Sequence, residues 1–538
     1  MLWVSKAALF GWILLVVATL YVCYFSHLGA IGFVGPDEPR YAWIAREMSE
    51  TGDWVTPRLY GKPWFEKPIL YYWGAALSFK IFGVNEAAAR LPSAVSALLA
   101  TLALAWLAWK VYDADVARWL LLLLPTTVGM IGFSHAAATD MPFAGMLTVA
   151  MVCAAVVVGL LPETPGRSKS SHTPWFDLIL FGFFMGAAVL AKGPAAILLC
   201  GGAVFFWALF TKRWRDAFRL LHPAAILTFC LTALPWYILC ARRNPDFLRI
   251  FIIEHNFKRY LTPEFQHIQP FWYYVPILIL ALLPWTWGLF VWRSGNRRVN
   301  REFIFFLSFA FFPIFFFSLS KSKLPGYILP AIPPFALLLT NSLNNALKFD
   351  RKVGRVTVVL LATTILGFGI GIRHYVSNHI LGQDILPAPW TISAWLPLIL
   401  AGIAAATLAT VRKTKIAMYT LHLALLLALL GLYGGLHWMD PKLSAKGIIK
   451  TAFPSSQTVP EKMVYAFDLP RGVHYGLNFY FHREIPGWNS QIEPKGSVFT
   501  SWKGKQQLVS AGYSCQSQIV YPAAILCSPK PPDSSGER

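Results

Sequence analysis

Charged residues are scarce in this chain of 538 residues, since Asp, Glu, Lys and Arg together make up only 14% of it. Hydrophobic residues make up 56%, above the roughly 45–50% of soluble domains. They gather in repeated runs long enough to match the about 20 residues that cross a bilayer core of roughly 30 Å. The scarcity of charge therefore excludes a soluble globular protein and predicts an α-helical polytopic membrane protein.

Motifs for nucleotides and metals are also missing. The chain has neither a GxxxxGK[ST] loop nor a GxGxxG after a strand, and its seven cysteines have no metal-ligand spacing. We therefore expect no nucleotide substrate. Cys515 and Cys527 lie in the polar C-terminal tail, and they would be able to form a disulfide if that tail faces an oxidising compartment.

Acidic residues are outnumbered, with 26 Asp and Glu against 47 Lys and Arg, for a net charge of +21. In a soluble protein such an excess would suggest nucleic-acid binding. Here most basic residues fall in short connections between apolar runs, which is the pattern of cytoplasmic loops. We therefore expect membrane lipids, and not nucleic acid, as partners.

Thirteen apolar runs are expected to span the membrane. They lie at about 7–26, 89–109, 117–134, 141–161, 175–191, 194–210, 221–240, 274–292, 302–319, 326–344, 355–373, 391–410 and 416–437. Basic connections such as 110–118 and 411–415 alternate with less basic ones, which places the N-terminus in the cytoplasm. Loops 35–73 and 241–273 and the tail 439–538 are then periplasmic, if the protein lies in the inner membrane of a Gram-negative cell.

The chain is expected to divide into a membrane domain, residues 1–438, and a soluble C-terminal domain, residues 439–538. The tail has the alternating stretches KMVYAF (462–467), NFYFHR (478–483) and SQIVYPAAIL (517–526), which predict short strands. A small α/β domain follows from this pattern. The last residues, PKPPDSSGER, have the composition of a disordered segment.

The loop 35–73 gathers charged and aromatic residues that would be expensive to place in hydrocarbon. Pro36 predicts a turn before a helix that has Asp37 in its first turn, where a carboxylate suits the helix dipole. Arg40 and Tyr41 follow at i+3 and i+4 and share the face of Asp37. This pattern fits a catalytic carboxylate with cationic support, and it equally fits a surface helix with an internal ion pair.

Three further segments add charge to the same outer side. WFEKP holds Glu66 and Lys67 beside aromatic residues, and Pro68 disfavours helix at Lys67. Asp140 stands at the outer end of the fourth span, where it also fits a helix cap. Lys192 lies between two spans on the less basic side, so we expect it to have an anionic partner.

Two more segments complete this set of cations. IFIIEHNFKRY (250–260) predicts a short helix on the membrane surface and contains Arg259. SKSKLPGY supplies Lys321, Lys323 and Tyr327. Cations at the level of lipid head groups fit a phosphate or pyrophosphate, and carboxylates among them fit general-base catalysis or a divalent cation. A lipid-linked phosphate substrate would supply an external enzyme without a nucleotide.

The motifs PDEPRYAWIAREMSETGDWVTP, WFEKPILYYW, AKGP and SKLPGYILPAIPP, together with Asp140, resemble the aminoarabinose lipid A transferase (ArnT-like) family. These are GT-C glycosyltransferases, related more distantly to dolichyl-phosphate-mannose protein mannosyltransferases. The resemblance covers about residues 1–440. It implies an inverting transfer of a sugar, such as 4-amino-4-deoxy-L-arabinose, from a polyprenyl-phosphate donor to a periplasmic lipid or glycan acceptor such as lipid A.

The resemblance also implies roles for single residues. Asp37 matches the family's principal catalytic carboxylate, and Glu66 and Asp140 match acidic positions of the cavity. Glu66 is the one candidate ligand for a possible divalent cation. The residues expected to bind the carrier phosphate are Arg40, Tyr41, Lys67, Lys192, Arg259, Lys321, Lys323 and Tyr327.

Three other functions stay open. A protein or glycan glycosyltransferase of the mannosyltransferase type would use a similar donor with another acceptor. A flippase for a lipid-linked sugar would need polar residues at mid-membrane and broken helices, whereas the spans are apolar through their centres. A membrane anchor for the C-terminal domain would leave the charged loop 35–73 without a purpose.

Overall fold

The structure is a computed structural model that describes residues 6–162, 175–262, 268–293, 300–349, 351–379, 389–453, 464–489, 496–516 and 523–530. The chain forms two compact units. The helical unit comprises Met1–Ser26, Trp64–Gly74 and Leu91–Leu432. The mixed unit comprises His27–Pro63, Ala75–Arg90 and Tyr433–Arg538.

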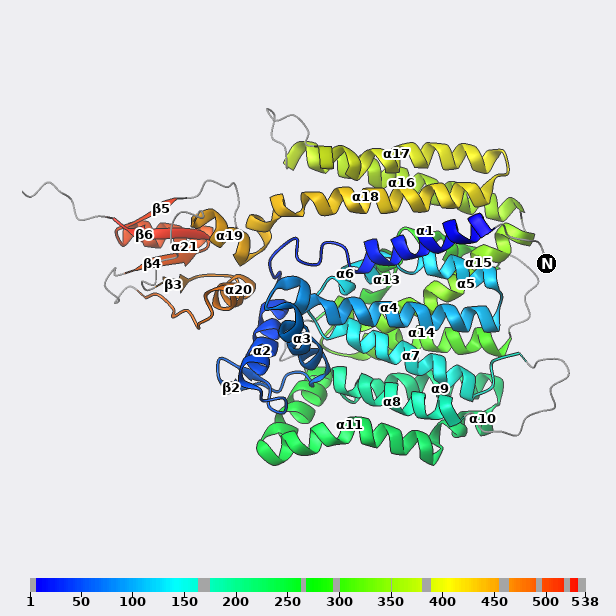
Figure 1. Ribbon diagram of the computed structural model, residues 1–538, viewed down its shortest axis with the longest axis horizontal. Helices are drawn as coiled ribbons and strands as arrows, with labels where there is room; N and C mark the ends of the chain where they lie inside the picture. Colours follow the sequence, from blue (N-terminus) through cyan, green and yellow to red (C-terminus); the bar gives the residue numbers. More distant parts are fainter. Residues whose placement is uncertain are drawn as a thin grey trace, which may run out of the picture. The chain divides into compact units, whose positions relative to one another are not determined.

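Apolar helices build the helical unit, and Figure 1 shows the longer ones side by side with their axes roughly parallel. They are α1 (Lys6–Tyr24), α4 (Glu86–Val111), α5 (Ala114–Leu123), α6 (Val128–Ser134), α7 (Asp140–Val157), α8 (Trp175–Lys192), α9 (Ala195–Thr211), α11 (Pro223–Arg243), α13 (Tyr274–Ala281), α14 (Arg301–Leu319), α15 (Ile332–Phe349), α16 (Arg351–His379), α17 (Pro389–Thr410) and α18 (Thr414–Leu443). Helices α4 and α18 have residues in both units.

Short elements connect these helices. They are α10 (Trp214–Phe218), η1 (Arg219–Leu221), the π-helix η2 (Arg249–Lys258), α12 (Arg259–Leu261), η4 (Phe271–Tyr273), η5 (Trp285–Arg293) and η6 (Pro325–Ala331). The helix predicted over 250–260 is confirmed by η2 and α12.

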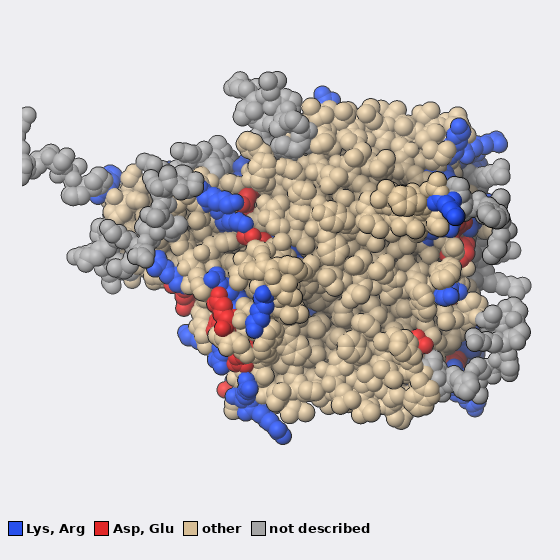
Figure 2. Space-filling model, viewed as in Figure 1, with Lys and Arg blue, Asp and Glu red and all other residues tan. Residues whose placement is uncertain are grey.

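Ten helical segments of the described chain are long and apolar enough to cross a membrane, and the pair α5 and α6, bent by 59°, would be an eleventh. Each of the thirteen predicted spans coincides with helix, but α9 has only 17 residues and the span predicted at 274–292 is divided into α13 and η5. Figure 2 shows few charged side chains along the flank of the helical unit. The polytopic helical fold is confirmed, and the count of thirteen stays a prediction.

Glycines allow α8 and α11 to pack closely. A Cβ atom at Gly182 would lie 2.2 Å from the carbonyl oxygen of Ala225, and one at Gly186 would lie 2.7 Å from Cβ of Thr232. The two glycines are one helical turn apart, which is the small-xxx-small spacing of close helix pairs in membranes. This contact fixes α8, whose last residue is Lys192.

The mixed unit contains helices and short strands. They are α2 (Asp37–Thr51), β1 (Arg58–Leu59), β2 (Lys62–Pro63), α3 (Leu70–Phe82, shared with the helical unit), α19 (Ala445–Ala452), β3 (Val464–Phe467), α20 (Arg471–Phe481), β4 (Ser497–Thr500), α21 (Trp502–Ser510), β5 (Tyr513–Gln516) and β6 (Ile525–Pro529). The main sheet has the order β3-β4-β6-β5, with β3 and β4 parallel and the other pairs antiparallel. The predicted small α/β fold of the tail is confirmed.

Two detailed predictions for the tail can be compared with the structure. KMVYAF ends in strand β3, although Lys462 and Met463 lie outside the described residues. The strand predicted over NFYFHR is wrong, because Asn478–Phe481 belong to helix α20. Residues 517–522 of the third predicted strand and 531–538 of the predicted disordered end also lie outside the described part. Cys515 and Cys527, whose pairing the sequence left conditional on the compartment, form a disulfide between paired strands.

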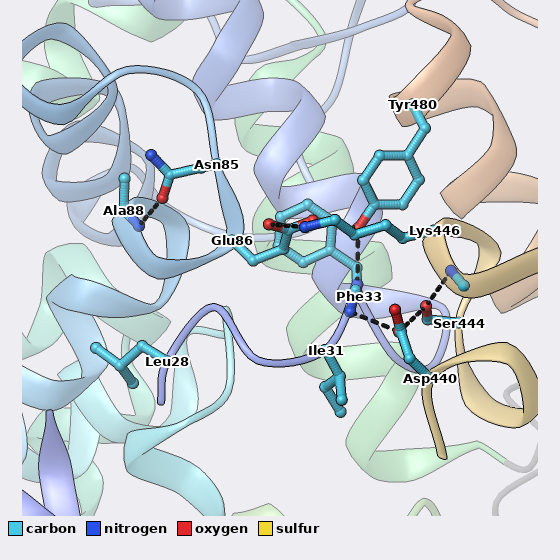
Figure 3. A network of polar contacts seen from close by, with 12 residues as sticks. Leu28, Ile31, Phe33, Asn85, Glu86, Ala88, Asp440, Ser444, Lys446 and Tyr480 are labelled. Carbon is cyan, nitrogen blue, oxygen red and sulfur yellow. Dashed lines mark hydrogen bonds and ion pairs between the residues drawn. The ribbon is translucent and has the colours of Figure 1, made fainter. Parts of the chain in front are cut away.

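A polar network fastens the segment around Gly32 inside the mixed unit (Figure 3). The Asp440 carboxylate accepts hydrogen bonds from the Gly32 amide, at 2.8 Å, and from the Ser444 hydroxyl. Glu86 accepts bonds from the Tyr480 hydroxyl at 2.7 Å and from Lys446 at 2.8 Å. These contacts join the chain just before α2 to α4, α18, α19 and α20.

Candidate active site

The WFEKP segment forms a non-helical bend in the helical unit, since α3 begins only at Leu70. Nζ of Lys67 lies 3.8 Å from Oε1 of Glu66, and a guanidinium nitrogen of Arg259 lies 3.3 Å from the same oxygen. All three side chains are at most 14% exposed. The bend and the short helix α12 thus bring one carboxylate and two cations together.

Asp140 and Lys192 form a second group. Asp140 begins α7, Lys192 ends α8, and Oδ1 of Asp140 lies 2.5 Å from Nζ of Lys192. The anionic partner predicted for Lys192 is therefore confirmed. The Asp140 carboxylate lies close against Gly326, where a Cβ atom would be 2.7 Å from Oδ1.

Tyr327 links the two groups. Its ring centre is 4.9 Å from Nζ of Lys192, and its side chain shares a hydrogen bond with Arg259. The side chain is only 8% exposed. The segment η6 holds it in place, since the sequence LPGYILP favours a tight turn before α15. Five predicted site residues, Glu66, Lys67, Asp140, Lys192 and Arg259, therefore meet around one tyrosine.

An apolar cavity of about 490 Å³ lies beside these side chains. Glu66, Lys67, Lys192, Arg259 and Tyr327 all line it. The remaining wall is mainly apolar and includes Ile197, Leu198, Phe251, Phe257, Leu261 and Phe316. A cavity with cations in its wall and an otherwise mainly apolar lining suits a ligand with an anionic head and a long apolar tail.

Burial changes the protonation of Lys67. Burial, reinforced by the nearby charges of Arg259 and Lys192, lowers the pKa of the Lys67 ammonium to about 8, and Glu66 and Asp140 oppose this change only in part. Burial also lowers the pKa of His255. Lys67 is therefore a cation at neutral pH, and a bound anion would stabilise its charge.

Lys321 and Lys323 lie on the loop before η6 but are not among the residues that line the cavity. Nζ of Lys323 donates hydrogen bonds to the carbonyls of Ser320, at 2.6 Å, and Gln269, at 3.1 Å. The ammonium thereby ties two loops together. Lys321 is exposed, and its backbone amide donates to the carbonyl of Tyr260 at 3.0 Å.

Asp37, Arg40 and Tyr41 belong to the mixed unit, where they begin α2. The expected ion pair between Asp37 and Arg40 is present. Nε of Arg40 donates to the Pro36 carbonyl at 2.9 Å, and its guanidinium lies 5.4 Å from the ring centre of Tyr475. The Asp37 side chain is 49% exposed, whereas Tyr41 is buried. Their predicted participation in the site stays a prediction.

The sequence reading missed the contact that fixes the start of α2. Arg90 binds both carboxylate oxygens of Glu38, at 2.9 and 2.8 Å, and donates to the carbonyls of Leu28, Ile31 and Gly32 at 2.7 to 3.0 Å. Both side chains are buried. Because the two residues are 52 positions apart, no local pattern could have paired them.

Three lining residues of the cavity were also missed, namely His255, Asn256 and Tyr260. They lie on η2 and α12, the segment that supplied Arg259. His255 and Arg259 are four positions apart, so a helical projection of this segment would have placed them on a similar face.

The donors near Glu66 do not fit a divalent cation. Its Oε1 faces two cationic side chains, and no group of three or more His, Cys, Asp or Glu side chains in the described chain is arranged to hold a metal. The metal-binding role of Glu66 stays a prediction, and the reaction is derived from the protein's own side chains.

Comparison with known proteins identifies the family. The family model for dolichyl-phosphate-mannose-protein mannosyltransferase matches residues 10–251. The undecaprenyl phosphate-alpha-4-amino-4-deoxy-L-arabinose arabinosyl transferase of Serratia proteamaculans is 33% identical over 381 residues, which are 68% of this chain and 67% of that protein. The chain belongs to this arabinosyl transferase family. The family that the sequence motifs indicate is thereby confirmed.

Other members of the arabinosyl transferase family match to a similar extent. The protein of Yersinia enterocolitica is 34% identical over 67% of this chain, and that of Enterobacter sp. is 32% identical over 64%. The match spans 66% and 64% of the length of these two relatives.

Solved structures confirm the fold. The crystal structure of ArnT from Cupriavidus metallidurans bound to undecaprenyl phosphate has a TM-score of 0.75 and 23% identity, and the match covers 96% of this chain and 98% of that one. The same protein in the apo state gives a TM-score of 0.74 and 24% identity, with 97% and 98% covered.

Proposed function

We propose that this protein is a glycosyltransferase that moves a sugar from a polyprenyl-phosphate donor to a periplasmic acceptor, with 4-amino-4-deoxy-L-arabinose as the sugar and lipid A as the acceptor. The observation that carries this proposal is that Lys67, Arg259, Lys192 and Tyr327 together line an apolar cavity. The names of the relatives support the choice of carrier and sugar.

The reaction breaks the bond between the anomeric carbon of the sugar and the carrier phosphate. The acceptor oxygen attacks from the opposite side, so the configuration inverts, and polyprenyl phosphate leaves with the electron pair. Lys67 and Arg259 stabilise the charge that develops on the phosphate oxygen, and in a buried site such preorganised donors act strongly. Tyr327, held by Arg259, supplies a hydroxyl at the same place.

The carboxylates of the cavity have supporting roles in this proposal. Asp140 fixes the ammonium of Lys192 at 2.5 Å, and Glu66 holds Arg259 at 3.3 Å. Each of these two carboxylates offsets the charge of its cation. The cavity therefore carries less net positive charge before the donor binds. Glu66 is also the group placed to orient sugar hydroxyls.

Asp37, the catalytic carboxylate that the resemblance implies, acts on the acceptor side in this proposal. An acceptor hydroxyl needs a general base, which the exposed carboxylate of Asp37 supplies. A lipid A phosphate is already ionised, and Asp37 then positions the acceptor. The division into a membrane domain, residues 1–438, and a soluble C-terminal domain, residues 439–538, stays part of the proposal, with all the site residues in the first.

We also propose that the N-terminus is cytoplasmic and that the C-terminal domain lies in the periplasm. The basic short connections support this orientation. The disulfide between Cys515 and Cys527 supports it independently, because such bonds persist in oxidising compartments.

A transfer assay with purified protein tests the proposal. Radiolabelled undecaprenyl-phosphate aminoarabinose is offered with lipid A, with a glycan or with a Ser/Thr peptide, and the labelled product is identified. We expect label on lipid A, and nearly none with Asp37→Asn. Label on the peptide or glycan alone would assign the protein to the mannosyltransferase type, and a wild-type rate in Asp37→Asn would remove Asp37 from the mechanism.

A further inference from the structure

A second pocket, which is polar and has a volume of about 410 Å³, lies in the helical unit at the turn between α17 and α18. Arg355, Arg412, Lys413 and Lys415 line it, together with Leu347, Gly354, Thr414 and Ile416. No acidic side chain is among the described residues of its wall. None of its residues takes part in the cavity around Tyr327, so the proposed transferase reaction leaves this pocket unexplained.

The turn holds its cations in a fixed geometry. Arg412 adopts a left-handed backbone conformation with φ of 64°. Its amide donates to the carbonyl of Ala409 at 3.2 Å, and the Lys413 amide donates to that of Leu408 at 2.8 Å. Helix α18 begins at Thr414, so the positive end of its dipole adds to the charge of the pocket.

Two acidic side chains, Asp113 and Asp115, the second of which interacts with Lys415, already have cationic partners. Nζ of Lys348 lies 3.0 Å from Asp113 and 2.8 Å from Asp115, and Arg118 lies 3.5 Å from Asp115. Lys415 also interacts electrostatically with Asp115. Among the described residues, the wall of the pocket contributes four cations and no carboxylate.

The surroundings of the pocket match the boundary between lipid and water. Helices α16, α17 and α18 each contain a segment apolar enough to cross a membrane, and the pocket lies at their ends. Val411, Ile416 and Val356 beside it are between 54% and 59% exposed. In Figure 2, blue side chains gather at the right-hand end of the helical unit, where α17 turns into α18 in Figure 1.

We propose that this pocket binds the phosphate head group of an anionic phospholipid, with the acyl chains along the exposed apolar residues of α16 and α18. Basic pockets between transmembrane helices are typical sites for such head groups. A soluble phosphate ester shares the head-group chemistry but would gain nothing from the apolar residues at the rim. The pocket is thus a regulatory or anchoring lipid site, separate from the proposed donor site.

Lipid titration by native mass spectrometry of the full-length protein tests this proposal. The delipidated protein is titrated with cardiolipin and, separately, with phosphatidylcholine. Two variants remove two charges each: Arg412→Gln/Lys413→Gln in the pocket and Lys212→Gln/Arg215→Gln in the basic segment between α9 and α11, which does not line it. We expect cardiolipin to bind about 10-fold more weakly to the pocket variant and with wild-type affinity to the control.

Equal weakening in both variants, or wild-type cardiolipin affinity in the pocket variant, would overturn the proposal, as would equally tight binding of phosphatidylcholine by the wild type. Glycerol 3-phosphate distinguishes the source of the phosphate, since displacement of cardiolipin by it would assign the pocket to a soluble ester. If the pocket double variant does not fold, the single exposed substitution Arg412→Gln replaces it, and we expect a smaller loss in the same direction.

Discussion

Lys67 differs from the other cations of the cavity in that its charge can be lost within an accessible pH range. Arg259 carries a guanidinium, which stays protonated at any pH at which the protein is folded. Burial and neighbouring cations lower the pKa of Lys67 to about 8. A lysine therefore makes the binding of the carrier phosphate sensitive to pH, whereas an arginine at the same position would not.

We predict that kcat/KM for the polyprenyl-phosphate sugar falls as the pH rises through 8. The cationic fraction of Lys67 is largest below this pKa, and it decreases about 10-fold between pH 7 and pH 9. The phosphodiester of the donor does not titrate in this range, so the change belongs to the protein. A pH profile of initial rates at low donor concentration measures it.

The variant Lys67→Arg provides the control for this profile. It keeps a cation without a titration near pH 8, so we expect the decrease above pH 8 to vanish even if the absolute rate is lower. The same decrease in Lys67→Arg would show that another group causes it. Lys321→Arg, at an exposed position outside the cavity, should leave the wild-type profile unchanged.

The pair of Asp140 and Lys192 allows a double-mutant cycle. Asp140→Asn leaves the buried ammonium of Lys192 without its charged partner at 2.5 Å, and we expect a 10- to 100-fold loss of kcat/KM, about 1.4–2.8 kcal/mol. If Asp140 acts through Lys192, adding Lys192→Met should cost little more, with a coupling energy of about 1–3 kcal/mol. Fully additive losses would give the two residues independent roles.

The cavity residues were predictable from sequence to different degrees. Lys192 was assigned an anionic partner because a cation on the less basic side of the membrane is unusual, and Asp140 is that partner. Lys321 and Lys323 have the same local signature as Lys67, yet Lys323 binds loop carbonyls and Lys321 is exposed. Local pattern does not reveal which way a loop lysine points, because tertiary packing decides it.

Helices α8 and α11 approach each other closely because the glycines of α8 at their contact have no side chain. A methyl group at Gly182 would lie 2.2 Å from a backbone carbonyl, so we predict that Gly182→Ala destabilises the protein by about 1–3 kcal/mol. Thermal unfolding in detergent measures this change. Gly201→Ala in neighbouring α9 is the matched control, since nothing lies within 4 Å of its Cβ position. Equal melting temperatures of the two variants would contradict the close contact.

The buried pair of Glu38 and Arg90 should hold the start of α2. Arg90→Met leaves the buried Glu38 carboxylate without its cationic partner and removes the donor to three carbonyls, so we predict a loss of roughly 3–5 kcal/mol. Arg58→Met, which breaks the more exposed pair with Asp53 at 3.6 Å, should cost roughly 0–1 kcal/mol. Limited proteolysis across a denaturant series compares the two, and equal protection would refute the difference.

The helices were predictable because long apolar runs admit few alternatives, whereas the tail was harder. The alternation in NFYFHR suggests a strand, but the buried residues of α20 include Val473, Gly476 and Leu477, which follow helical spacing. The helix ends at Phe481, and its C-cap residue His482 has a left-handed conformation. A short alternating stretch fits either structure, and here packing against α19 and α2 inside the mixed unit decides in favour of the helix.

The orientation of the membrane part can be tested with two surface positions. We predict that Lys321→Cys reacts with a membrane-impermeant maleimide in cells with a permeable outer membrane, whereas Lys413→Cys reacts only after the inner membrane is opened. Both lysines are exposed, and of the native free cysteines four are buried. Cys230→Ser, which removes the remaining partly exposed thiol, is the background for both. The opposite labelling pattern would reverse the topology.

The most direct test of the proposed carrier site measures transfer and translocation in the same liposomes. Wild type, Lys67→Met and Lys321→Met are reconstituted with radiolabelled undecaprenyl-phosphate aminoarabinose and lipid A. We predict that label reaches lipid A in wild type and in Lys321→Met and that Lys67→Met loses nearly all transfer. Movement of the carrier across the bilayer without transfer in the wild type, or a wild-type transfer rate in Lys67→Met, would contradict the proposed function of the cavity.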